Sequence, residues 1–198
     1  MEKINEFSMS YLKERLKHAI RFRHKRGYGV HSPFMFNLIL NVIRDKEKRF
    51  SYPDGLGKNR ELRNREKKVF RLLSRLIRHL KTEQICCLGI HAPLLVEYLR
   101  QTYPTAIITC NDLEQLEKID FLYIGRKAEE YVQLGTLETL LDRKKIKYII
   151  VSDIYKTSLH SRLWRMYRNQ ATAIVDMMWY GLLVYDEKVQ RGKYNLII

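Results

Sequence analysis

The spacing of hydrophobic residues changes at about residue 82. Before it, apolar residues recur every three to four positions, as on one face of an α-helix, and predict helices over residues 8–26, 33–45 and 59–80. In the third helix the apolar face comprises Val69, Phe70, Leu73, Leu76, Ile77 and Leu80, and the charged face includes Arg71, Arg75 and Arg78. The first part of the chain is therefore predicted to be helical.

From residue 83 onwards, short apolar segments alternate with amphipathic ones. The predicted strands are 84–88, 106–110, 121–124, 148–152, 172–176, 182–185 and 194–198. The predicted helices are 93–102, 127–142 and 158–169, with a short polar helix or loop over 112–118. This alternation predicts an α/β fold with a mostly parallel, doubly wound sheet. Because residues 186–193 leave no room for a crossover helix, we expect the last strands to pair antiparallel.

The start of the second helix has a clear signature. Ser32 fits its N-cap, and Pro33 fits its first position, where a missing N–H is harmless. His31, just before them, has two interpretations. It is a docking or catalytic residue, or it belongs to a segment that caps the helix and packs Phe34 and Phe36 onto the core. We favour the second.

Positive charge is concentrated in the first part of the chain. Residues 1–82 contain 22 Lys and Arg against 8 Asp and Glu, a net charge of +14, whereas residues 83–198 contain 15 against 14, a net charge of +1. We therefore expect a basic helical N-terminal extension, 1–82, attached to a nearly neutral α/β domain, 83–198. Such an asymmetry indicates an acidic partner: nucleic acid, an anionic membrane surface or an acidic protein.

The basic helices favour a nucleic-acid interpretation in particular. Each Lys or Arg that neutralises a phosphate adds salt-dependent affinity, and the interleaved Tyr11, Phe22 and Tyr28 offer stacking surfaces for bases. The alternatives are a solvated helix face or a basic amphipathic helix lying on a membrane. No RRM or KH signature is present in the sequence.

Several classes of protein are disfavoured by the sequence. No apolar stretch is long enough to span a bilayer, and residues 1–6 do not resemble a secretory signal, so we expect a soluble, cytoplasmic protein. Cys86, Cys87 and Cys110 form no spaced framework and are interpreted as reduced core residues. No His/Cys spacing indicates a metal site, and the sequence does not indicate an oligomeric state.

Four stretches resemble one bacterial family assigned to the class I S-adenosylmethionine-dependent methyltransferases. Residues 26–36 (RGYGVHSPFMF) resemble its HGVHSPFVF signature, and residues 176–185 (DMMWYGLLVY) resemble its DLFxxGIVFF end. Residues 69–80 resemble the helix before its first strand, and residues 151–154, with Ser158 and Trp164, resemble its fifth strand and following helix. The similarity spans most of the chain.

The resemblance implies a fold, a cofactor and a site. The fold would be a Rossmann-like sheet that ends in an antiparallel hairpin, and the cofactor would be S-adenosylmethionine. Gly89, His91 and Asp112 would lie beside the cofactor, and Asp153 near the methyl acceptor. His91 has the alternative of a surface residue at a helix start, which we favour, and Asp153 the equally weighted alternative of a helix N-cap.

The chain departs from the family pattern in its cofactor motifs. Where the family has E-L-G-T-S-L-G after the first strand, this chain has Cys87-Leu88-Gly89-Ile90-His91-Ala92-Pro93: Cys87 replaces the acid and Pro93 the last glycine. A proline fixes φ and removes an N–H, which disturbs the usual turn.

Further along, the departures continue. The acid after the second strand falls at Asn111 or Asp112, and the acid after the family's fourth strand is replaced by Gly125. Residues 112–119 are too few for the usual crossover, so either a strand is missing or the connection is unusual.

Two functional hypotheses follow. The first is a methyltransferase-like protein, degenerate and with weak or no catalysis. The second is a non-catalytic binding module whose cationic N-terminal helices bind nucleic acid or an acidic partner. An open pocket beside Gly89 would favour an enzyme, and a pocket filled by Ile90, His91 or Tyr155 would favour the binding module.

Overall fold

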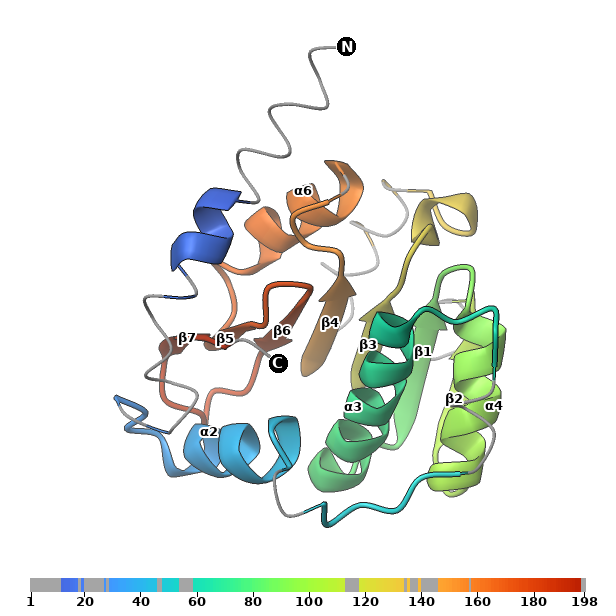
Figure 1. Cartoon of the computed structure of the whole chain (residues 1–198), viewed down its shortest axis with the longest axis horizontal. Coiled ribbons are helices and arrows are strands. Elements are labelled where there is room, and N and C mark those ends of the chain that lie inside the picture. The colour runs from blue at the N-terminus through green and yellow to red at the C-terminus, as the bar shows by residue number, and fades with distance from the viewer. Residues whose placement is uncertain are drawn as a thin grey trace. The chain divides into compact units, whose positions relative to one another are not determined.

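The structure is a computed structural model in which the chain divides into two compact units, one comprising residues 41–146 and the other residues 1–40 and 147–198 (Figure 1). It describes residues 12–17, 19, 27, 29–45, 48–53, 59–112, 118–133, 135, 139, 146–156 and 158–196. The predicted boundary between residues 82 and 83 stays a prediction.

The unit of residues 41–146 is built on three parallel strands. Its elements are α3 (Asn64–Leu80), β1 (Gln84–Leu88), α4 (Ala92–Thr102), β2 (Ile107–Cys110), β3 (Phe121–Ile124) and a 3₁₀ turn, η3 (Ala128–Glu130). Strand β1 is central and pairs in parallel with β2 on one side and β3 on the other. Helix α4 packs against β1 and β2, and α3 packs against α4. The predicted α/β class is confirmed.

The sequence of β1 reflects its central position. Because it is covered on both faces, it carries a continuous apolar run in which Cys86 and Cys87 are fully buried and unoxidised. The neighbouring helix α3 ends at Lys81, which adopts the left-handed conformation with φ +51°. The N–H of Thr82 then donates to the carbonyl of Ile77 at 3.2 Å, which satisfies one of the last carbonyls of the helix.

Among the described residues no strand lies between β2 and β3. Residues 111–120 connect these two strands, which flank β1 on opposite sides, and residues 113–117 of this connection lie outside the described residues. Ten residues are fewer than a helical crossover plus an additional strand require. The length favours the missing strand, and the choice between the two expected explanations stays a prediction.

The other unit contains a mixed four-stranded arrangement. Its elements are α2 (Pro33–Asn37), β4 (Tyr148–Ser152), α6 (Ser158–Tyr167), β5 (Ala173–Asp176), β6 (Tyr180–Val184) and β7 (Gly192–Asn195); a π-helix, η2 (Leu38–Ile43), follows α2 and leads into residues 41–146. Strand β6 lies between β4 and β5 and is antiparallel to both. The predicted antiparallel hairpin is confirmed for β5 and β6.

The last strand corrects one expectation. Strand β7 does not pair with β6; it pairs in parallel with β5, on the side away from β6. Residues 185–191 connect β6 to β7 across the end of β5 and form no helix. A short loop is sufficient because β6 and β7 lie on either side of β5. In the same region Gly181 of β6 lies directly against the fully buried indole of Trp164, so a side chain at this position would clash with α6.

The helix after Ser32 begins as predicted but changes its geometry. The Ser32 hydroxyl accepts a hydrogen bond from the N–H of Met35 at 3.3 Å, which confirms the predicted cap. From Leu38 the predicted helix continues as η2. His31 is exposed, and Met35 enters the core while Phe36 is exposed, so the expected packing of Phe36 onto the core is wrong.

Two other predicted helices lie partly outside the described residues. In the predicted 8–26 helix, residues 12–17 and 19 are helical. The candidate stacking residues Tyr11 and Phe22 in that helix, and Tyr28 after it, lie outside the described residues. In the predicted 127–142 helix, η3 is the longest described element. No helix among the described residues is long and apolar enough to cross a bilayer, and no group of three or more metal-ligating side chains is found among them.

Candidate functional site

The loop after β1 begins at Gly89, where the backbone is in a conformation that favours glycine. Its φ is +122°, and a Cβ there would lie 2.7 Å from the carbonyl oxygen of Arg126 and 2.9 Å from the carbonyl carbon of Gly125. The space that a Cβ on Gly89 would occupy is thus taken by the chain that follows β3. Gly89 is needed here for a contact within the protein itself.

Backbone hydrogen bonds continue this contact beyond the two strands. The N–H of Gly125 donates to the carbonyl of Leu88 at 2.8 Å, and the N–H of Ile90 donates to the carbonyl of Arg126 at 3.0 Å. A Cβ on Gly125 would lie 2.6 Å from the Leu88 oxygen, so the glycine at this position permits the close approach. Open α/β folds bind ligands in a crevice at the carboxyl ends of their strands. Between β1 and β3, at this edge, the two chains stay paired just beyond the ends of both strands.

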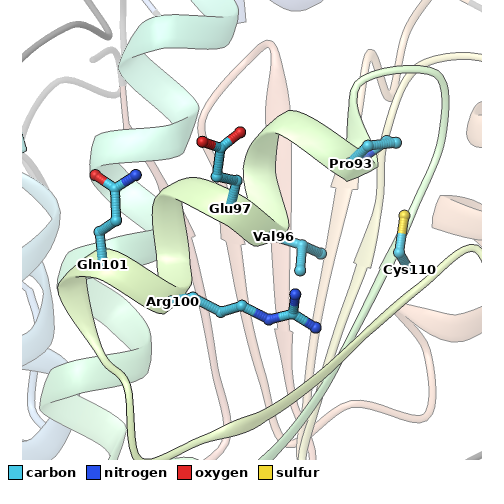
Figure 2. Close-up of a pocket in the computed structure, with 6 residues that line it drawn as sticks. All are labelled: Pro93, Val96, Glu97, Arg100, Gln101 and Cys110. Atoms are coloured by element: carbon cyan, nitrogen blue, oxygen red, sulfur yellow. The ribbon is translucent and has the colours of Figure 1, made fainter.

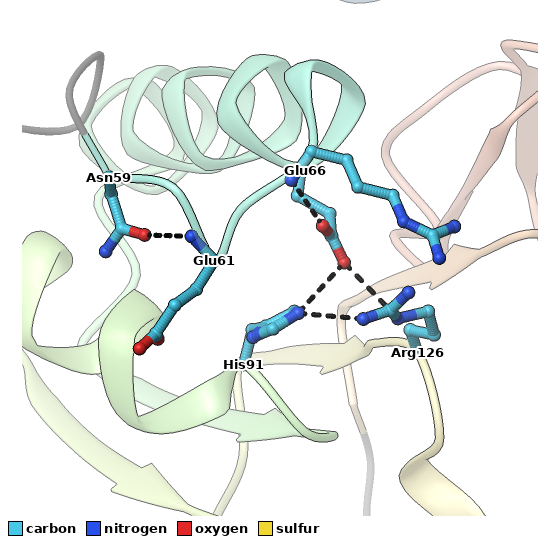
Figure 3. A network of polar contacts seen from close by, with 6 residues as sticks. Asn59, Glu61, Glu66, His91 and Arg126 are labelled. Atoms are coloured by element: carbon cyan, nitrogen blue, oxygen red, sulfur yellow. Dashed lines mark hydrogen bonds and ion pairs between the residues drawn. The ribbon is translucent and has the colours of Figure 1, made fainter.

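Three side chains meet over this contact. Glu66 reaches from the first turn of α3, His91 precedes α4, and Arg126 follows β3; Figure 3 shows all three pointing toward one another. The Oε1 atom of Glu66 lies 3.3 Å from His91 Nε2 and 3.4 Å from Arg126 Nε. Arg126 Nη2 lies 2.9 Å from His91 Nε2.

The chemistry of this cluster defines the role of each member. A guanidinium can only donate hydrogen bonds, so Arg126 lies between two side chains that can accept them, with Nη2 at His91 Nε2 and Nε facing the Glu66 carboxylate. Glu66 also accepts the N–H of Arg63 through Oε2 at 2.8 Å, which caps the start of α3. One carboxylate therefore joins α3 to the loops after β1 and β3. The three side chains are largely buried, with Arg126 the most exposed at 26%.

The end of β2 is likewise turned toward β1. Asn111, with φ +54°, accepts the N–H of Gly89 through Oδ1 at 2.7 Å and donates through Nδ2 to the Gly89 carbonyl at 3.4 Å. Its own N–H donates to the carbonyl of Cys87 at 2.9 Å. The next residue, Asp112, accepts the thiol of Cys86 at its backbone oxygen, at 3.4 Å. The amide of Asn111, one of the two positions at which the acid after the second strand is expected, thus fastens the glycine loop.

The N-terminus of α4 has few donors left for a ligand. The N–H of Ala92 donates to the carbonyl of Gly89 at 3.0 Å, and Pro93 has none. His91 is the N-cap residue but makes no capping hydrogen bond with its side chain. Free N–H groups make helix N-termini favourable for anions, so this start of α4 is a weaker anion site than most.

Asp153 lies in the other unit and is held in a local turn. With φ +49°, it donates its N–H to the carbonyl of Trp179 at 2.6 Å and accepts the N–H of Lys156 at 2.8 Å. Its carboxylate pairs with the Lys156 ammonium at 3.8 Å, and that ammonium lies 4.9 Å from the centre of the Trp179 ring. Because α6 begins at Ser158, Asp153 is not its N-cap.

The neighbouring Tyr155 is bound to Asp176 at the end of β5. Its hydroxyl donates to Asp176 Oδ2, and the N–H of Met178 donates to Asp176 Oδ1 at 2.9 Å. Burial, and then the negative charge of Asp176, hold the pKa of Tyr155 well above its usual value. A neutral phenol bound to a buried carboxylate is a structural arrangement, not that of a catalytic base.

A pocket of about 500 Å³ lies elsewhere, along α4 and the end of β2 (Figure 2). It is lined by Pro93, Val96, Glu97, Arg100, Gln101 and Cys110. Figure 2 shows Glu97 and Gln101 on the other side of the helix from Cys110, and Arg100 donates to the backbone carbonyl of Ile108 at 3.3 Å. Burial raises the pKa of the Cys110 thiol, which disfavours a nucleophilic thiolate. The polar groups do not converge on one ligand.

Of the predicted site residues, Gly89, His91 and Asp112 lie in one unit, at the ends of β1 and β2, and Asp153 lies in the other. Their roles toward a cofactor stay predictions. Sequence reasoning missed Glu66 and Arg126, for which the only local signal is a carboxylate three residues after the start of a helix. Comparison of the chain with protein-family models, with curated proteins and with solved structures finds no match.

Proposed function

We propose that this protein is a methyltransferase-like protein without methyl transfer, and that it serves as a nucleic-acid-binding module through its basic helices. The main observation against an enzyme is the contact between Gly89 and the backbone of Gly125 and Arg126. A cofactor lying over Gly89 would have to displace the backbone of Gly125 and Arg126, which is hydrogen-bonded to the backbone of Leu88 and Ile90. The loss of that pairing opposes binding.

The descent from methyltransferases rests on different residues. The resemblance of residues 26–36 and 176–185 is supported by the position of β6, which runs antiparallel between β4 and β5 as the implied C-terminal hairpin requires. The same resemblance names S-adenosylmethionine as the ancestral cofactor. In this chain Cys87 and Gly125 stand where the family has acids, and Asn111 bonds to Gly89. Fold and ancestry together do not require activity.

The binding role rests on uncompensated positive charge. Residues 1–82 carry a net charge of +14, and α3, within them, has solvent-exposed cations along one side. Phosphates are the partners that such a surface favours, because each contact releases counterions from the nucleic acid. We infer that the partner is nucleic acid, since its uniform array of phosphates matches a cationic surface without requiring a specific pocket.

Fluorescence anisotropy with labelled oligonucleotides tests this function. We expect binding at 50 mM salt that weakens steeply by 200 mM, with a linear plot of log K against log salt concentration. A polyglutamate chain of similar length is the control for a general response to anions, and we expect it to compete weakly. Absence of oligonucleotide binding at 50 mM salt would refute the proposed function.

A further inference from the structure

The outer side of α3 carries four cations in one row. Lys68, Arg71, Arg75 and Arg78 are separated by three, four and three positions, which places them on the same helix face. Ten residues of α-helix span about 15 Å. The row is therefore long enough to contact several successive phosphates of one strand.

Within the described part of the chain, no acidic side chain is paired with this row. Among the residues that the structure describes, none of the four forms an ion pair, and Glu66 on the same helix is engaged with His91 and Arg126. Like charges three and four residues apart repel and weaken a helix. An anion along this face would relieve the repulsion, so the helix itself favours a polyanionic partner.

Aromatic rings hold the arginines in place. The Arg71 guanidinium lies 5.4 Å from the centre of the Tyr52 ring, and the Arg78 guanidinium lies 5.6 Å from the centre of the Phe50 ring. Both rings are half-buried in the segment that leads toward α3. Positions fixed in advance lower the entropy lost on binding, and arginine stacked on an aromatic ring keeps its N–H groups free for phosphate.

Arg75 has a different task. Its Nε donates to the carbonyl of Val42 at 2.6 Å, and its Nη2 donates to the carbonyl of Ile43 at 3.1 Å, so it caps the end of η2. Its Nη1 donates to the Tyr52 hydroxyl at 2.6 Å. Arg75 thus fixes Tyr52 against the helix, which leaves Lys68, Arg71 and Arg78 as the exposed cations.

A buried polar group lies close to this cluster. The Tyr98 hydroxyl has no hydrogen-bond partner among the described residues, although Tyr98 is only 6% exposed. Burial, reinforced by Tyr52, raises the pKa of Tyr98 to about 12, and the nearby charges of Arg71 and Arg75 act in the opposite direction. The hydroxyl therefore belongs to the same electrostatic environment as the row of cations.

From these observations we propose that the α3 face binds one single strand of nucleic acid, with phosphates on Lys68, Arg71 and Arg78 and bases stacked on the Phe50 and Tyr52 side. The combination of a cationic track with aromatic rings is the arrangement that single strands favour, because duplex bases are already stacked and paired. This inference rests on the proposed function and goes further by naming the surface and the form of the nucleic acid.

The first test removes the cations. Lys68→Gln, Arg71→Gln and Arg78→Gln are combined in one variant, and Arg162→Gln, Arg165→Gln and Lys193→Gln, exposed cations of the other unit, form the charge-matched control. For a labelled single-stranded 20-mer, three lost phosphate contacts lower the salt slope by about 2 and weaken binding about 100-fold at 0.1 M salt. We expect less than a threefold change in the control.

The second test removes the rings. Phe50→Leu with Tyr52→Leu should weaken single-strand binding about tenfold or more, leave the salt slope unchanged and leave weak duplex binding almost unchanged. Tyr52→Phe retains the ring and should retain the affinity. Circular dichroism and a thermal melt of each variant identify any loss of folding.

The outcomes separate the two proposals. If the wild-type protein binds no oligonucleotide, the proposed function fails and this inference fails with it. If it binds, but the two charge variants lose equal affinity or the duplex binds as tightly as the single strand, the function stands and the α3 site is overturned. Loss of affinity confined to the α3 and ring variants, with single strands preferred, establishes the site.

Discussion

Two surfaces of the unit formed by residues 41–146 differ in how their polar groups are compensated. At the carboxyl ends of β1, β2 and β3, the charged and amide side chains bind one another or the backbone: Glu66 with His91 and Arg126, and Asn111 with Gly89. On the outer face of α3, Lys68, Arg71 and Arg78 have no acidic partner among the described residues, and two of them rest on aromatic rings.

This difference teaches where to look for function in a chain that resembles an enzyme. Groups that are satisfied within the protein contribute to stability and have little left to offer a ligand. Like charges without an acidic partner destabilise the helix that carries them, and an anionic partner removes this destabilisation. The strand ends around Gly89 thus have the features of a structural core, whereas the α3 face has those of a binding surface.

The largest expected effect comes from inserting a side chain at Gly89. Gly89→Ala forces a Cβ to 2.7 Å from the Arg126 carbonyl at a φ of +122°, and we expect a loss of about 3 kcal/mol in the free energy of unfolding. Urea denaturation followed by circular dichroism measures it. Gly135→Ala is the control, since a Cβ there meets nothing within 4 Å, and it should change stability by less than about 1 kcal/mol.

If Gly89→Ala proved as harmless as Gly135→Ala, the main chain after β3 would not be fixed against Gly89. The ends of the two strands would then be free to separate, and the contrast between the two surfaces would lose its basis.

The next effect concerns the carboxylate that joins the three elements. Glu66→Ala removes the partner of His91 and Arg126 and the cap of α3, so we expect a loss of about 2 kcal/mol in the free energy of unfolding. Glu61→Ala, an exposed carboxylate that forms none of these contacts, is the matched control and should change stability by less than about 0.5 kcal/mol. Equal effects of the two substitutions would show that the cluster contributes nothing.

The third prediction concerns Asp120, which immediately precedes β3 and is expected to make the stability of the fold depend on pH. Burial alone would raise the pKa of Asp120, but the N–H groups of Gln84 and Glu83, both at 3.3 Å, and the Lys118 ammonium outweigh it and hold the pKa below its usual value. A carboxylate whose pKa is lower in the folded state stabilises that state at pH values above its pKa in the unfolded chain, about 4. This stabilisation is lost as the pH falls through the pKa of the folded state.

We therefore expect Asp120→Asn to be less stable than the wild type by about 1 kcal/mol at pH 7. The gap should narrow progressively below about pH 5. Denaturation midpoints between pH 3 and 7 measure the gap, and a gap independent of pH would contradict the assigned hydrogen bonds.

The smallest effect has the opposite sign. Tyr98→Phe removes a buried hydroxyl that has no partner among the described residues and keeps the ring that lies 6.0 Å from Phe70. We expect the free energy of unfolding to rise by up to about 1 kcal/mol. A thermal melt beside the wild type tests this, and a clear loss of stability would reveal a hydrogen bond to that hydroxyl.

Local patterns were sufficient to predict much of the secondary structure. Strands β1, β3 and β4 fall at their predicted bounds, because each is a buried run of four or five residues between polar ones. Helix α3 begins at Asn64 instead of residue 59, since Glu66 caps Arg63 and fixes the first turn. The partner of β7 was not predictable, because a loop's length does not determine which side of β5 it reaches.

The site was less accessible to sequence reasoning. Gly89 was singled out correctly as an unusual position, but the backbone it contacts lies 36 and 37 residues further along the chain, at Gly125 and Arg126. A glycine that admits a cofactor and a glycine that admits another strand end look the same in a sequence. Only the approach of β1 to β3 distinguishes them.

The account's central claim is that the strand ends around Gly89 do not admit S-adenosylmethionine, and calorimetric titration of S-adenosylhomocysteine and S-adenosylmethionine into the intact protein tests it most directly. We predict no heat of binding up to 1 mM ligand and no shift of the melting temperature. A dissociation constant near 10 µM, with the stabilisation of about 2.7 kcal/mol that a hundredfold excess of ligand over this constant then requires, would contradict the claim and restore the enzyme hypothesis.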